Sequence, residues 1–292
     1  MNQFFRRASL TACVSVLAVL GSFSTLTASL SVEETRTMWD ANSDLWIWLL
    51  ESEHAYFRNH VSGPAFMAAL PEVAGKRGLD IGCGHGFVTR LAADKGASMT
   101  GLDISPNLIR YAESRELREH KGISYVEGDA MNLPFDSEAF DFVTAFCSFM
   151  DFADVDAALN EASRVIKPGG FFQMTIMHPC FWVQDNDWVV DDNNVRTAMI
   201  INSYFDHEEE RIVDWYPEGL TQTELGDMKP FRTALYRRTL SEWINALAGS
   251  GFSIEYVDEP IPTEELVAEY PTLDGSRVVP YFLTLRCRKL SI

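Results

Sequence analysis

The stretch GLDIGCGHGF, residues 78–87, decides the fold of this chain. Its apolar start predicts a buried strand, and the glycines that follow predict a tight turn that opens a helix. Such a turn is a place where a nucleoside cofactor can bind, although a glycine cluster of this kind is as often only a turn. The spacing is G-x-G-x-G, whereas dinucleotide sites use G-x-G-x-x-G, and the early third glycine weakens the case for a pyrophosphate.

A second strand ends in a carboxylate about twenty residues later. The segment 98–103 (SMTGLD) reads as a short strand that closes on Asp103. A carboxylate at the end of the second strand can accept both hydroxyls of a ribose lying across the glycine turn. Asp103 could instead cap the next helix, but Ser105 and Pro106 already supply an N-cap and a first-turn proline. This leaves Asp103 for a ligand.

A third strand, about residues 123–127, ends in Gly128, Asp129 and Ala130. A side-chain acceptor and a backbone N–H at that point can meet the edge of an adenine ring. Because the carboxyl ends of parallel strands lie on one edge of a sheet, three strand ends are expected to converge on one nucleoside.

With these motifs in order, the chain resembles the class I S-adenosylmethionine-dependent methyltransferases, in particular the small-molecule type 11 group that includes the quinol methylases. The resemblance runs from about Trp39 to Arg288 and is carried by these segments: 79–86 (LDIGCGHG), 101–105 (GLDIS), 128–130 (GDA), 133–135 (LPF), 140–143 (FDFV) and 164–170 (RVIKPGG). It implies that S-adenosylmethionine is the cofactor and that the enzyme methylates O, N or C of a small molecule, expected to be neutral or cationic.

The resemblance also assigns the cofactor contacts. Asp80 and the three glycines would hold the methionine end, Asp103 the ribose, and Asp129 with Ala130 the adenine, while Phe146 would flank the cofactor. The full predicted set is Asp80, Gly82, Cys83, Gly84, Gly86, Asp103, Ile104, Asp129, Ala130 and Phe146.

Two other functions use the same strand, turn and helix. The first is an NAD-dependent oxidoreductase, which the missing G-x-G-x-x-G and the expected reversal of the last strands disfavour. The second is a non-catalytic module that binds S-adenosylmethionine. This alternative is less attractive because the chain also has an aromatic insertion, residues 179–235, that looks built to enclose a ligand.

Composition narrows the class of partner. A formal charge of −18 argues against nucleic acid, whose binding depends on clustered Lys and Arg. The five cysteines are scattered without the spacing of a zinc or redox site, so no metal is expected.

Residues 1–31 resemble a secretory signal or short anchor. The cofactor is made in the cytosol, so we expect a cytoplasmic enzyme, with membrane-anchored, organellar or exported forms left open and membrane contact only through this leader.

The rest of the chain, residues 32–292, reads as one methyltransferase domain. Alternating patterns predict a Rossmann-like, doubly wound, seven-stranded α/β sheet with a reversed C-terminal hairpin. The expected helices are 35–53, 63–70, 87–95, 106–120, 155–166 and one that starts with a capping box at 239–242 and stops at 249–251. The expected strands are 78–81, 98–103, 123–127, 140–146, 170–177, 252–257 and 278–286.

Residues 179–235 interrupt this alternation with an aromatic, acidic segment. The segment is too rich in Trp, Tyr and Phe to be disordered, so it predicts a folded lid over the acceptor site.

A general base is needed only if the acceptor must first lose a proton. His178, at the end of the fifth strand, is the candidate, with fixing of the Pro179 turn or a core hydrogen bond as its structural alternative. Weaker candidates are Tyr204, His207 and Tyr236.

Overall fold

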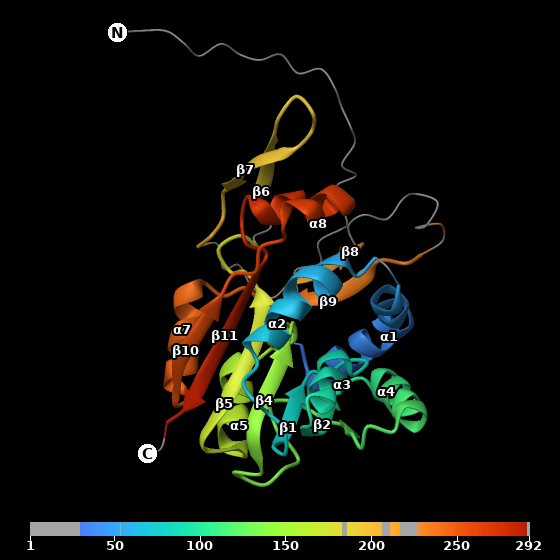
Figure 1. The fold of residues 1–292 in the computed structure, drawn as a ribbon, viewed down its shortest axis with the longest axis vertical. Coiled ribbons are helices and arrows are strands. Elements are labelled where there is room, and N and C mark those ends of the chain that lie inside the picture. Colours follow the sequence, from blue (N-terminus) through green and yellow to red (C-terminus); the bar gives the residue numbers. More distant parts are fainter. Residues whose placement is uncertain are drawn as a thin grey trace.

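A mixed seven-stranded sheet forms the centre of the fold (Figure 1). The computed structural model describes residues 30–52, 54–182, 186–205, 211–216, 226 and 228–290. The sheet has the order β10-β11-β5-β4-β1-β2-β3. Its strands are β1 Arg77–Ile81, β2 Ser98–Asp103, β3 Ser124–Glu127, β4 Phe140–Phe146, β5 Ile166–Met177, β10 Phe252–Asp258 and β11 Phe282–Lys289. Strands β1 to β5 pair in parallel, and β11 runs antiparallel to both neighbours, which confirms the predicted fold and reversed hairpin.

Helices flank the sheet, and six of them follow the predicted ranges within a few residues: α1 Val32–Glu51, α2 Gly63–Ala69, α3 Phe87–Asp94, α4 Pro106–Glu119, α5 Val155–Val165 and α7 Leu240–Gly249. The helix α8 Glu264–Glu269 was not predicted, and neither were the short helices η1 Phe57–Ser62, η2 Phe149–Asp151 and η3 Pro271–Arg277. Ser105 caps α4 by accepting from the Leu108 amide, and Thr239 forms the expected capping box with Glu242 on α7. These side chains satisfy amides that the first helical turn leaves unpaired.

The two faces of the sheet pack differently. On the face covered by α5 and α7, apolar side chains of β4 and β5 alternate inward and fill the main core around Phe172 and Trp243. The opposite face holds a smaller apolar cluster, in which the rings of Phe142 and Phe171 stack 5.1 Å apart. Towards the C-terminal ends of the strands this second face turns polar, with Thr144 and Gln173 fully buried, so the core itself prepares a polar edge for a ligand.

Two strand boundaries differ from the predictions. The run 278–286 was expected to be all strand, but β11 starts only at Phe282, after Pro280, because proline has no amide for the ladder. Strand β5 was expected to begin at Gly170, yet pairing starts at Ile166 and then shifts register before Phe171. The predicted turn at 167–170 is therefore an irregularity within the strand.

In the part of the predicted insertion that the structure describes, the strands form two hairpins. The first pairs β6 Asn186–Val190 with β7 Arg196–Ile201, and the second pairs β8 Arg211–Trp215 with β9 Phe231–Leu235. Figure 1 shows the first hairpin standing away from the sheet beyond α8, and the second beside α1. Both lie at the end of the molecule where the parallel strands finish, which is the edge that binds ligands in open α/β sheets.

The predicted leader falls on residues that are mostly outside the described part of the chain. The description begins at Leu30, and Ser31 caps α1 through a capping box with Glu34. Within the residues described, none of the helices has the length and apolar character needed to cross a membrane.

Candidate functional site

The glycine turn after β1 contains three residues with left-handed backbone angles, Gly82 (φ 67°), Gly84 (φ 54°) and Gly86 (φ 85°). Two of them are required by packing: a Cβ on Gly82 would lie 2.4 Å from the Cβ of Ser148, and one on Gly86 would lie 2.3 Å from the hydroxyl of Tyr125. A Cβ on Gly84 would meet only the Trp46 indole nitrogen, at 3.9 Å. Gly84 is therefore the position that leaves backbone open to a ligand.

Asp103 lies directly beside this open glycine. The Gly84 amide donates to Oδ2 of Asp103 at 2.8 Å, and the Ser105 amide donates to Oδ1 at 2.9 Å. Burial raises the pKa of Asp103, and these backbone hydrogen bonds oppose the shift. Ser105 caps α4 as predicted, but Asp103 is also tied to the turn. Each carboxylate oxygen can accept more than one hydrogen bond, so a ribose hydroxyl can still be received there.

Asp80 lies beneath the turn rather than on its open side. Its oxygens accept from the hydroxyls of Thr89 at 2.6 Å and Thr144 at 2.8 Å, and the side chain is only 2 % exposed. Burial raises the pKa of Asp80 to about 6 in spite of these hydrogen bonds. The arrangement fixes β1, β4 and α3 relative to one another, which sets the position of the glycine turn.

The remaining predicted cofactor residues flank the same edge. Asp129 accepts from the Met131 amide at 2.9 Å and forms the turn after β3, and Ala130 is buried in the main core. Cys83 is buried, and Ile104 is half-buried beside Asp103. At the end of β4, the Phe146 ring packs against two aromatic rings, those of Phe66 at 5.2 Å and Phe87 at 6.1 Å.

Helix α1 covers the turn, which sequence reasoning did not predict. Oδ1 of Asp40 accepts from the Ser105 hydroxyl and from the Asn107 amide, each at 2.9 Å, so α1 is attached to the first turn of α4. Six residues later on the same helix, Trp46 lies opposite Gly84. Asp40 is one of four polar residues in the segment 40–44, and no local pattern distinguishes it as the one that contacts α4.

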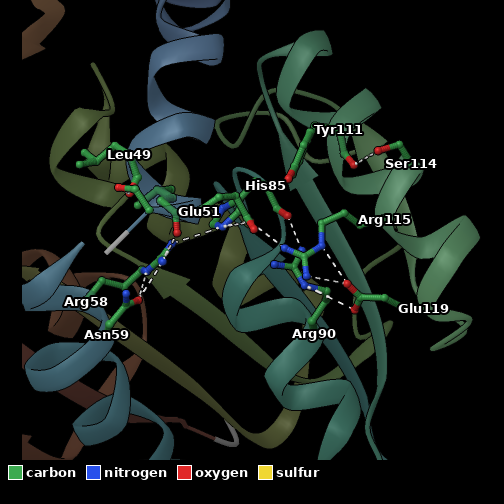
Figure 2. A network of polar contacts seen from close by, with 12 residues as sticks. Leu49, Glu51, Arg58, Asn59, His85, Arg90, Tyr111, Ser114, Arg115 and Glu119 are labelled. Atoms are coloured by element: carbon green, nitrogen blue, oxygen red, sulfur yellow. Dashed lines mark hydrogen bonds and ion pairs between the residues drawn. The ribbon is translucent and has the colours of Figure 1, made fainter. Parts of the chain in front are cut away.

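A charged network holds the other end of α1 against the glycine turn (Figure 2). Glu51 pairs with Arg115 of α4 at 2.6 Å and lies 3.5 Å from Nε2 of His85, the residue between Gly84 and Gly86. Arg58 lies over the Phe87 ring at 4.6 Å and 3.3 Å from the same histidine nitrogen. Burial, and then the nearby arginines including Arg90, hold the pKa of His85 well below its usual range. His85 is therefore a neutral part of the turn.

His178 lies directly after β5, within one residue of its predicted place at the strand end, and both of its ring nitrogens have partners. Nδ1 accepts from the Cys180 amide at 3.2 Å, which leaves the proton on Nε2, 2.8 Å from Oε1 of Glu259. Burial lowers the pKa of His178, and Glu259 opposes the shift. Glu259 follows β10, two strands from β5 on the side away from β1. The imidazole thus faces the β10 edge rather than the glycine turn, and its role as a general base stays a prediction.

The second hairpin of the insertion is attached to α1. The side-chain amide of Asn42 donates to the Arg232 carbonyl at 2.8 Å and accepts from the Arg232 amide at 3.2 Å. Beside this pair, the fully buried ring of Phe231 packs against Trp46 at 5.4 Å and stacks on Trp215 at 4.7 Å. We call the Asn42–Arg232 pair and these three rings the clasp. It joins the element over the glycine turn to the insertion.

The insertion also encloses a cavity at the ends of β4 and β5. Strand β9 packs on η2, directly after β4. An open cavity lies there, between η2, the end of β5, the first hairpin's flanks and the start of α7. Its lining residues are Met150, Met177, Pro179, Trp182, Tyr204, Leu235, Tyr236, Arg237, Arg238 and Trp243. Tyr204 and Tyr236, two of the weaker predicted candidates, are thus brought to one wall, while His207 lies outside the described residues.

Asp151, beside this cavity on η2, should make stability fall as pH rises. Burial raises the pKa of its carboxyl to about 8, from an ordinary 3.8. The native state therefore holds a proton that the unfolded chain releases between about pH 4 and pH 8, and the free energy of unfolding decreases through that window. Asp151→Asn should raise stability at pH 8 by at least about 1 kcal/mol, less than the full shift because the side chain keeps some exposure.

Thermal unfolding followed by circular dichroism at pH 4.5 and pH 8.5 checks this prediction. The gain should appear at pH 8.5 and vanish at pH 4.5, and Asp44→Asn, a matched change at an exposed position of α1, should alter neither. A gain of equal size at both pH values would show that Asp151 is ionised in the folded protein.

The sequence of this chain is similar to those of known methyltransferases. Residues 79–174 match the family described as "Methyltransferase domain". The chain is 35% identical over 155 residues to the phthiotriol/phenolphthiotriol dimycocerosates methyltransferase of Mycobacterium leprae, covering 52% of this chain and 55% of the relative. It is 38% identical over 114 residues to the fatty-acid O-methyltransferase of Mycolicibacterium smegmatis, covering 38% and 41%. The chain thus matches about half the length of these curated relatives.

A solved structure extends the likeness to most of the chain. An S-adenosylmethionine-dependent methyltransferase from Mesorhizobium loti is 29% identical, with a TM-score of 0.62, and the alignment covers 77% of this chain and 96% of that one. Within the residues described, no group of three or more His, Cys, Asp or Glu side chains is placed to hold a metal ion.

Proposed function

We propose that the protein transfers the methyl group of S-adenosylmethionine to a small-molecule acceptor, because residues 79–174 match a methyltransferase domain and the chain is similar to a solved S-adenosylmethionine-dependent methyltransferase. The observation that supports this most directly is the open backbone at Gly84 with the Asp103 carboxylate 2.8 Å from its amide. Glycine at that position leaves space for the cofactor, and the carboxylate offers an acceptor for the ribose. Asp129 and Phe146 would complete the binding edge.

The sulfonium of S-adenosylmethionine already activates the methyl group, so the protein has to align the acceptor and exclude water. The acceptor would lie at the ends of β4 and β5, under the insertion, which we propose as the lid. Strand β9 of the second hairpin packs on η2 at this edge, and the clasp fixes that hairpin to α1. Of the acceptor atoms O, N and C, an oxygen is favoured by the likeness to a fatty-acid O-methyltransferase.

Incubation of the protein with tritiated S-adenosylmethionine and a metabolite extract tests the proposal. Label should enter a small molecule. A separate binding assay compares S-adenosylmethionine with NAD, and only S-adenosylmethionine should bind. Binding of NAD without S-adenosylmethionine would favour the oxidoreductase, and cofactor binding without labelled product would favour the non-catalytic module.

Asp103→Ala should weaken S-adenosylmethionine binding about tenfold or more, since it removes charge-assisted hydrogen bonds worth about 1.5 to 3 kcal/mol. Calorimetry measures the affinity. Asp191→Ala is the matched control, because Asp191 also accepts from two backbone amides, those of Asn193 and Val195 at 2.9 Å each, but lies in the exposed turn of the first hairpin; it should leave the affinity unchanged. Unchanged affinity in Asp103→Ala would rule out its contact with the ribose.

A further inference from the structure

The cavity under the insertion contrasts in charge with the rest of the protein. The chain has a formal charge of −18, yet two of the cavity's lining residues are arginines, Arg237 and Arg238, and none is acidic. We propose that this cavity binds an acceptor with an apolar or aromatic body and a carboxylate, which pairs with Arg238. The proposal rests on the proposed function and names the class of acceptor for the same site.

The position of the cavity suits an acceptor. Met150 lies on η2, just after β4, and Met177 is the last residue of β5. These two strands end on the same edge as β1, whose glycine turn is the predicted cofactor site, and β4 is the direct neighbour of β1. A molecule in the cavity is therefore placed at the strand ends next to the cofactor edge, beside Leu235 at the end of β9.

Arg238 is placed to exchange its present partner for a ligand. Its Nη2 lies 3.4 Å from Oδ2 of Asp156, a side chain that is 59 % exposed. An ion pair of this length with an exposed partner contributes little, whereas a guanidinium binds a carboxylate through two parallel hydrogen bonds when the geometry is free to form. Arg237 adds positive charge on the same wall, and its Nη2 is oriented by the Ser203 carbonyl at 2.9 Å.

The remaining walls are apolar and aromatic. Trp182 is 52 % exposed although it lines the cavity, so its ring is available to a ligand. The hydroxyl of Tyr204 accepts from the Leu240 amide at 3.0 Å, which holds the phenol ring on the cavity wall at the start of α7. Aromatic faces of this kind bury the body of an apolar ligand, and the arginine then selects among bodies by charge. The geometry therefore favours an anionic acceptor over the neutral or cationic one expected from the sequence.

Three probes that share one ring system test this selection: 2-naphthoate, 2-naphthamide and 2-naphthylmethylamine. Tryptophan fluorescence of the full chain, saturated with S-adenosylhomocysteine, measures their affinities. The naphthoate should bind at least tenfold more tightly than the amide, and the amine should bind most weakly. Arg238→Gln should abolish the preference for naphthoate, and Arg238→Glu should reverse it in favour of the amine.

Arg232→Gln is the matched control, because Arg232 takes part in the clasp only through its backbone amide and carbonyl, while its side chain is 63% exposed on β9 and does not line the cavity. It should keep the preference for naphthoate. Equal affinities for the three probes, no naphthoate binding at millimolar concentration, or a preference that survives Arg238→Gln would overturn the proposal. Labelling of the metabolite extract by the same preparation tests the proposed function separately, so either result can fail while the other holds.

Discussion

Gly84→Val should weaken S-adenosylmethionine binding by about 100-fold or more, equivalent to about 2.7 kcal/mol. The backbone at Gly84 has φ 54°, where a branched side chain is strained, and its Cβ would point into the open space before Trp46. That space is where we place the cofactor. The side chain would therefore both distort the turn and fill the binding site. Calorimetry on the purified variant measures the loss.

Gly122→Val separates these two effects. Gly122 also has a left-handed backbone, φ 74°, in the connection between α4 and β3, and a Cβ there would have no neighbour within 4 Å. The substitution should cost stability through the same strain and leave cofactor affinity unchanged. If both variants lost affinity equally, the effect of Gly84→Val would be general destabilisation, and Gly84 would not mark the cofactor site.

Replacing residues 211–235 by a short Gly-Ser connection should reduce turnover by at least about a thousandfold, because water and misaligned acceptors would reach the methyl group. The clasp changes what is expected for the cofactor. Phe231 is buried against Trp46, and Trp46 lies opposite Gly84, so removal of the hairpin also frees α1 from the cofactor edge. We expect cofactor affinity to fall several-fold, which is much less than turnover.

Radiolabelled methyl transfer measures the turnover. Two further variants test whether the loss of turnover is specific to the second hairpin and its attachment to α1. Shortening the tip of the first hairpin, residues 191–195, to Asn-Gly should leave turnover nearly unchanged, because this tip is exposed and lies outside the clasp. Asn42→Ala removes only the hydrogen bonds to Arg232 and should lower turnover by a smaller factor than the hairpin replacement. Retention of turnover without residues 211–235 would exclude the second hairpin as part of a lid.

The parts of the fold that the sequence predicted well are those determined by residues close together in the chain. The Ser105 cap and the capping box on α7 each depend on contacts within three residues, and they were placed almost to the residue. Strand β4 was placed equally well because its apolar run is visible in the sequence. The two hairpins of the insertion were not resolved. The run 191–194 (DDNN) is a turn signal between β6 and β7, but the aromatic composition around it obscured the alternation of the strands.

The contacts that shape the site join distant residues and left no local pattern. Asp40 meets α4 across 65 residues, and Asn42 meets β9 across 190. His178 was correctly placed at the end of β5, but its partner Glu259 lies 81 residues away, and this partner decides the direction of the ring. The charge of the cavity was also hidden, because Arg237 and Arg238 stand outside the insertion as it was predicted and only the fold brings them beside Met150 and Met177.

The clasp also bears on how such an enzyme can be redesigned. Exchanging insertions between related enzymes is an obvious way to transplant a preference for one acceptor into another. Here residues 211–235 carry one half of an interface whose other half, Asn42 and Trp46, lies in α1. A grafted insertion would bring Phe231 without its tryptophan and leave the Asn42 amide facing a foreign backbone. A working chimera should therefore exchange residues 32–51 together with the insertion, as a single cassette.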